Sequence, residues 1–121
     1  MFVALAFALA TLSPGAAKPI PAFMQAGKLE ALCDAGAVQG DAELCAGYIL
    51  GSVDQVLAEQ DIWGRRRSVL CLPEDISVDQ LKSTILPYIQ QKPDQSSLAA
   101  ATLIAAALKA SYPCVQRRGG R

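Results

Sequence analysis

The stretch from residue 41 to residue 57, DAELCAGYILGSVDQVL, decides the fold expected for this chain. Its apolar side chains recur at intervals of three and four residues: they are Leu44, Cys45, Tyr48, Ile49, Val53, Val56 and Leu57. This spacing places them on one face of an α-helix. Asp41 is the expected N-cap residue, because its carboxylate can accept a hydrogen bond from a backbone N–H of the first turn. The stretch therefore predicts an amphipathic helix with one buried face.

Two glycines, Gly47 and Gly51, lie four residues apart within this predicted helix. Each glycine costs a helix interior about 1 kcal/mol relative to alanine. The pair is therefore either a tolerated cost or a flat face that lets another helix approach closely. We favour close packing of another helix.

One more helix is expected before this stretch and two are expected after it. Residues 26–35 form the first helix, and Gly36 is its C-terminal cap. Ser77 and Gln80 have the spacing of a capping box and open the third helix. Pro87 should kink or shorten that helix, because proline lacks a backbone N–H. The apolar stripe of the third helix consists of Val78, Leu81, Ile85, Tyr88 and Ile89.

The last helix is expected to start near residues 96–97 and to end at Pro113. Its core face is predicted to carry Leu98, Thr102, Ala105 and Leu108. Between the second and third helices, residues 59–75 show no sustained period and contain Gly64 and Pro73, so we expect a long loop there. Four helices around one core predict an all-α fold, a small irregular four-helix bundle.

Composition narrows the classes of function. A chain of 121 residues is long enough for one domain. Its 11 Lys and Arg residues balance its 11 Asp and Glu residues, which argues against a nucleic-acid partner. It has no histidine, the residue that most often serves as general acid or base and as a metal ligand. We therefore expect no catalysis, no metal and no cofactor, and we expect the protein to work by binding another protein.

Residues 1–17 are expected to be a cleaved signal peptide. The run MFVALAFALATL is apolar, and Gly15 and Ala17 supply the small residues of a cleavage site. No basic residue precedes the apolar run, so the true start codon stays open and a buried helix is the alternative. Pro14 ends the run short of the roughly 18 to 20 apolar residues that span a membrane, so we expect no stable membrane insertion. The mature domain then comprises residues 18–121.

The end of that domain, residues 117–121, reads RRGGR and is expected to be a flexible basic tail.

All four cysteines follow the predicted signal peptide. An even number of cysteines in a small exported protein predicts disulfide bonds. The absence of a Cys-x-x-Cys pair argues against structural zinc and thiol exchange. Three pairings are possible. The predicted helix ends favour Cys33 with Cys45, on either side of the first connection, and Cys71 with Cys114, on either side of the last two helices.

The predicted long loop contains the candidate partner-binding residues. They are Ile62, Trp63, Arg65, Arg66 and Arg67. Tryptophan and arginine are enriched among the residues that dominate the binding energy of protein interfaces. The alternative is that Trp63 packs into the core while the arginines are only solvated. Tyr48 is expected to be a core tyrosine, and neither it nor Asp54 is expected to be catalytic.

Several short motifs, taken in order, resemble the Rap/Tai family of immunity proteins. They are CAGYILGSVD (residues 45–54), CLP (residues 71–73), Tyr88 with Pro93, Ala107 with Leu108, and YPC (residues 112–114). The resemblance covers about residues 29–114. It departs from the family pattern at Ile89, where leucine is usual, and at Tyr112, where phenylalanine is commoner.

This resemblance implies a periplasmic, mostly helical protein that binds and inhibits a peptidoglycan amidase effector of a type VI secretion system. Family members are often dimers, so a homodimer is compatible with it. The alternative function is a general periplasmic chaperone or stress-response binding protein of the acid-resistance type, since such proteins are also small, helical and disulfide-linked. A chaperone would bind many unfolded clients weakly, whereas an immunity protein would hold one folded enzyme tightly.

Overall fold

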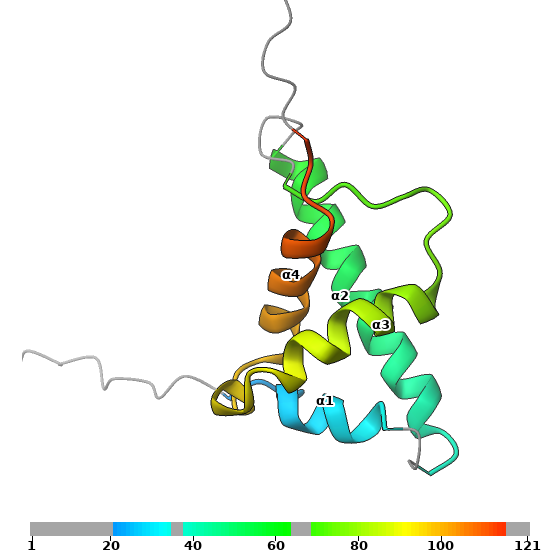
Figure 1. Cartoon of the computed structure of the whole chain (residues 1–121), viewed down its shortest axis with the longest axis vertical. Helices are drawn as coiled ribbons and strands as arrows, with labels where there is room; N and C mark the ends of the chain where they lie inside the picture. The colour runs from blue at the N-terminus through cyan, green and yellow to red at the C-terminus, as the bar shows by residue number, and fades with distance from the viewer. Residues whose placement is uncertain (1–20, 35–37, 64–68, 116–121) are drawn as a thin grey trace, which may run out of the picture.

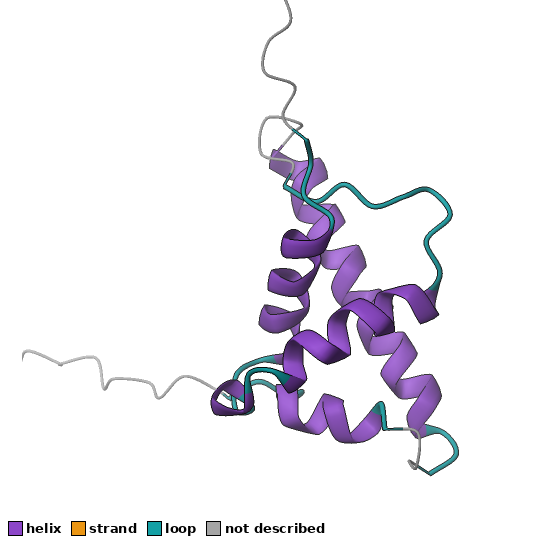
Figure 2. Cartoon of the chain, viewed as in Figure 1, coloured by secondary structure: helices purple, strands orange, loops and turns teal. Residues whose placement is uncertain are grey.

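A computed structural model describes residues 21–34, 38–63 and 69–115 of the chain (Figure 1). These residues form the α-helices α1 (Ala26–Leu32), α2 (Asp41–Trp63), α3 (Val78–Gln90) and α4 (Ala100–Ser111) and the short 3-10 helix η2 (Pro93–Gln95). The helices cross one another as an irregular bundle (Figure 2), which confirms the predicted all-α fold. The predicted signal peptide and the basic tail from residue 117 onward lie outside the described residues.

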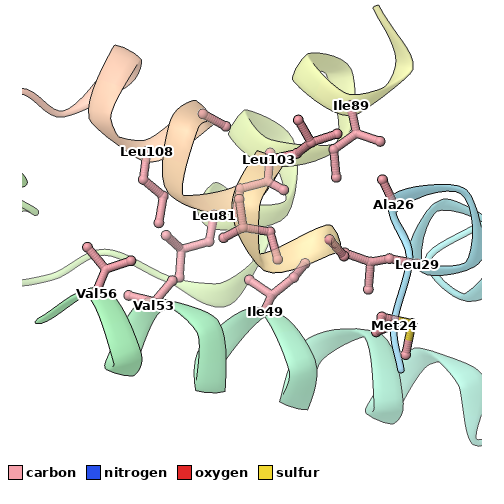
Figure 3. Close-up of a cluster of buried hydrophobic side chains, with 14 of the residues drawn as sticks. Met24, Ala26, Leu29, Ile49, Val53, Val56, Leu81, Ile89, Leu103 and Leu108 are labelled. Carbon is pink, nitrogen blue, oxygen red and sulfur yellow. The ribbon is translucent and has the colours of Figure 1, made fainter. Parts of the chain in front are cut away.

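One hydrophobic core lies between the four helices. In the close-up of Figure 3 the labelled side chains of α2 face those of α3 and α4. The most deeply buried large side chains are Leu29, Ile49, Ile85, Ile104, Leu108 and Cys45. Full burial of one such aliphatic side chain contributes about 1.5 to 3 kcal/mol, so these contacts dominate the stability of the bundle. The stripe predicted for α2 is confirmed except at Leu44, which is exposed.

The start of α3 follows the predicted capping box. The backbone N–H of Gln80 donates to Ser77 Oγ at 3.2 Å, and the backbone N–H of Ser77 donates to Gln80 Oε1 at 2.8 Å. Two of the N–H groups at the start of α3 are thereby satisfied. Pro87 lies inside the helix, which continues to Gln90, so the proline does not end it.

The predicted start of the last helix is wrong, and its predicted face is confirmed only at Leu108, which is buried, and at Ala105, which packs against the core. Helix α4 begins at Ala100, because Ala99 pairs with Gln25 in the segment that precedes α1. The N–H of Ala26 donates to the carbonyl of Leu98 at 2.9 Å in this pairing. Leu98 and Thr102 are exposed as a result. The buried face of α4 consists of Ala100, Leu103, Ile104, Ala107 and Leu108.

The ends of α1 and α2 also differ from the prediction. Helix α1 ends at Leu32, with Cys33 as its C-terminal cap, and the predicted cap Gly36 lies outside the described residues. Helix α2 extends to Trp63, so residues 59–63, which were predicted to be loop, are helical. None of residues 59–63 is buried, so the core imposes no apolar pattern on this last turn. Its sequence therefore lacks the apolar period by which a longer helix is recognised.

The close packing predicted for the two glycines of α2 is wrong. A Cβ atom added to Gly47 or Gly51 would meet no atom within 4 Å. The glycines face away from the core, and no other described helix packs against them. In the isolated chain they therefore lower the stability of the helix without making a packing contact, which is the alternative interpretation.

Both favoured disulfide pairs are present. Cys33 is bonded to Cys45, which joins the end of α1 to the first turns of α2. Cys71 is bonded to Cys114, which joins the segment before α3 to the segment after α4. The second bond closes a loop of 43 residues that contains α3 and α4, and it holds the segments that carry Cys71 and Cys114 together beside the end of α2.

Candidate protein-binding site

The last turn of α2 places two large apolar side chains in solvent. Ile62 is 76% exposed and Trp63 is 64% exposed. The interpretation in which Trp63 is a core residue is therefore wrong. Arg65, Arg66 and Arg67 directly follow this turn in the sequence but lie outside the described residues. Their part in binding stays a prediction.

A short antiparallel ribbon, residues 69–71 with residues 112–114, lies beside the end of α2 (Figure 1). Its bridge pairs Leu70 with Pro113. The N–H of Cys71 donates to the carbonyl of Tyr112 at 2.9 Å, and the N–H of Cys114 donates to the carbonyl of Val69 at 3.4 Å. The Cys71–Cys114 disulfide crosses the same pair of segments.

The side chain of Gln60 joins this ribbon to α2. Gln60 Oε1 accepts hydrogen bonds from the backbone N–H groups of Val69 at 2.9 Å and Leu70 at 2.7 Å. Gln60 Nε2 donates to the carbonyl of Leu70 at 3.0 Å. The amide thus satisfies both backbone groups of Leu70 on the side that faces away from Pro113, as a neighbouring strand would.

A groove of about 260 Å³ is bounded by α2, the ribbon and α4. We call it the Trp63 groove. It is lined by Val56, Glu59, Gln60, Trp63, Val69 and Lys109. Three of these side chains are apolar, and both Trp63 and Val69 are among the exposed large hydrophobic residues. Val115, which follows the ribbon, is exposed as well.

A second groove, of about 350 Å³, separates α1 from α3, and we call it the α1–α3 groove. It is lined by Gly27, Glu30, Ala31, Cys33, Asp34, Leu86 and Gln90. None of the exposed large hydrophobic residues lines it. Phe23, Val38, Leu44 and Leu98 are exposed elsewhere, but they line neither groove. Of these two grooves in the described part of the chain, the Trp63 groove is the one with exposed apolar walls.

The sequence singled out only part of this site. Ile62 and Trp63 stood out by residue type, whereas Gln60, Val69 and Lys109 carried no signal of their own. They meet because the ribbon returns to α2 and α4 packs beside it. Tyr48 is half-buried and packs against the core, as expected, and Asp54 is exposed.

A comparison with known protein families identifies the family of this chain. The model of the Rap1a immunity proteins matches residues 25–114. The chain belongs to this family. The matched region contains all four helices, both disulfide bonds and the Trp63 groove, and it confirms the resemblance found in the motifs. No curated protein and no solved structure matched the chain.

No helix among residues 21–34, 38–63 and 69–115 has the length and apolar character needed to span a membrane. In the same residues, no group of three or more cysteine or carboxylate side chains is placed so that it could hold a metal ion.

Proposed function

We propose that this Rap1a family protein is a periplasmic immunity protein that binds and inhibits a peptidoglycan amidase effector of a type VI secretion system. The observation that carries the proposal is the family match over residues 25–114. Two disulfide bonds support export, because such bonds persist in oxidising compartments. A signal peptide over residues 1–17 is part of the same proposal.

We assign the effector contact to the end of the molecule that consists of the last turn of α2 and the ribbon. We call it the ribbon end. What supports this assignment is the exposure of Ile62 and Trp63 beside the Trp63 groove. Exposed apolar patches of this kind mark interaction sites, and tryptophan is the residue type most enriched among interface hot spots. Arg65, Arg66 and Arg67 would add fork-shaped hydrogen-bond donors for carboxylates of the effector.

Inhibition by this surface needs no chemistry in the immunity protein. Helix α2 has 23 residues, and its last turn carries the two exposed apolar side chains. An end of this shape can cover the substrate cleft of an amidase and exclude the peptidoglycan peptide. The prediction that the protein is not an enzyme agrees with this mode of action.

The proposal is tested by titrating purified amidase effectors with the oxidised protein and measuring cleavage of peptidoglycan fragments. We expect complete inhibition of one amidase at one binding site per effector. Weak binding of many unfolded proteins, with no amidase inhibited, would contradict the proposal and favour the chaperone alternative. Light scattering of the free protein checks the homodimer, which stays a prediction.

The Trp63→Ala variant tests the location of the contact. We expect it to weaken effector binding by about 30-fold or more, the loss of at least about 2 kcal/mol that defines a hot spot, with little change in the melting temperature. Leu44→Ala is the matched control, because Leu44 is an exposed apolar residue on the first turn of α2, far from the groove. Equal affinity of the two variants would place the contact elsewhere.

A further inference from the structure

We propose that Gln60 is the positioning residue of the Trp63 groove: it holds the Val69 wall where an apolar side chain of the effector can enter against Trp63. This inference rests on the proposed function, because it concerns how the effector contact is shaped. Gln60 itself is half-buried and lies one turn before Trp63 on the same helix.

Val69 has little else to hold it. Its side chain is exposed, so core packing does not fix it. Its carbonyl accepts only the long 3.4 Å bond from Cys114, whereas its N–H donates to Gln60 at 2.9 Å. The next residue, Leu70, is buried and has both backbone groups bonded to Gln60. The position of the Val69 backbone relative to α2 is therefore set by the hydrogen bonds of Gln60 together with the burial of the Leu70 side chain.

The three hydrogen bonds require an amide of this length. Gln60 Oε1 uses both of its lone pairs on the N–H groups of Val69 and Leu70. Only an NH₂ group on the same side chain can also donate to the carbonyl of Leu70. A glutamate would retain the two accepted bonds but would direct a carboxylate oxygen at that carbonyl. A methionine would have the length and none of the bonds.

The same hydrogen bonds define what kind of effector element fits. Gln60 occupies the free backbone groups of Leu70, and Pro113 on the other strand has no N–H to offer. Neither strand of the ribbon therefore offers an open edge at its bridge for an added strand. The remaining feature is the groove of about 260 Å³ with its apolar walls Val56, Trp63 and Val69. We infer that it receives an apolar side chain from a projecting loop of the effector.

The first experiment needs no effector. In Gln60→Met, the amide protons of Val69 and Leu70 should exchange about tenfold faster, since one hydrogen bond protects by about that factor. Cys71, whose N–H donates to Tyr112, should change less. Acrylamide should quench the fluorescence of Trp63, the single tryptophan of the chain, to a different extent in this variant than in the unaltered protein. Gln90→Met is the control, because Gln90 is exposed on the last turn of α3 and lines the α1–α3 groove instead of the Trp63 groove.

The second experiment measures effector affinity per folded molecule for the same variants. Gln60→Met should bind about tenfold more weakly, Gln90→Met should bind like the unaltered protein, and Gln60→Glu should recover part of the affinity. Unchanged amide exchange, or unchanged affinity despite faster exchange, would overturn the role of Gln60. If the unaltered protein inhibits no amidase, the proposed function fails, and exchange and quenching still decide whether Gln60 holds the wall.

Discussion

The α1 end and the ribbon end of the molecule are built from the same parts but bury them differently. Each end has a disulfide bond and a pair of antiparallel backbone segments. At the α1 end, Cys45 is 0% exposed, and the Gln25–Ala99 pairing leads directly into buried residues of α1 and α4. At the ribbon end, Cys71 is exposed and Leu70 is the buried member of the ribbon.

The two grooves show the same contrast. The α1–α3 groove is lined by polar and small residues for the most part, because the large apolar side chains of α1 and α3 point into the core. The Trp63 groove keeps a tryptophan and a valine in contact with water. Soluble proteins tolerate scattered apolar residues at their surfaces, but apolar walls gathered around one hollow are typical of binding sites. Exposed apolar walls therefore surround the groove at the ribbon end but not the groove at the α1 end.

The disulfide bonds at the two ends should differ in how much they contribute to the free energy of unfolding. Replacing Cys71 and Cys114 by alanine should lower the free energy of unfolding by about 4 kcal/mol for a separation of 43 residues, because the unfolded chain regains loop entropy. Replacing Cys33 and Cys45 should cost about 3 kcal/mol for a separation of 12 residues. Urea unfolding of both double variants measures the two values.

The control for this pair is the unaltered protein with both bonds reduced, which should be less stable than either double variant. The reverse order of the two costs would mean that the packing of buried Cys45 outweighs loop entropy. Effector binding gives a second readout. It should weaken per folded molecule only when the bond at the ribbon end is removed.

Truncating one apolar side chain at each end should change the free energy of unfolding by very different amounts. Leu29→Ala at the α1 end should lower the free energy of unfolding by about 3 kcal/mol, because Leu29 is fully buried and the substitution leaves a cavity. Ile62→Ala at the ribbon end should change it by less than about 0.5 kcal/mol, since Ile62 is exposed. Thermal unfolding provides both values. A loss above about 1 kcal/mol in Ile62→Ala would assign that residue to the fold instead of the binding surface.

The parts of the fold that the sequence predicts are those decided within one helix. The spacing of Ile49, Val53 and Val56 on α2 and the capping box of Ser77 and Gln80 depend only on helical geometry, and both are confirmed. The disulfide pairs could be chosen because each pair flanks helices that neighbour one another in the chain. The family motifs point to the same fold.

The parts that it missed depend on contacts between distant segments. Leu98 leaves the predicted helix because its carbonyl bonds to the N–H of Ala26, more than seventy residues earlier in the chain. The Trp63 groove likewise needs Lys109 from α4 and Val69 from the ribbon. No local sequence pattern predicts these contacts between distant segments. The sequence therefore indicated the exposed tryptophan but not the groove beside it.

The smallest expected effect concerns the outer face of α2, which connects the two ends. Gly47→Ala should raise the free energy of unfolding by about 1 kcal/mol, because alanine favours the helix and the added Cβ meets no neighbour. Gly40→Ala is the opposite case: Gly40 has a φ of 101°, so the same added atom should destabilise the fold by about 1 kcal/mol. Thermal unfolding of the two variants checks the signs.

Effector affinity should be unchanged in Gly47→Ala, because the ribbon end is untouched. A weaker complex would show that the effector also covers the glycine face of α2, and the contact would then extend from the ribbon end along that helix.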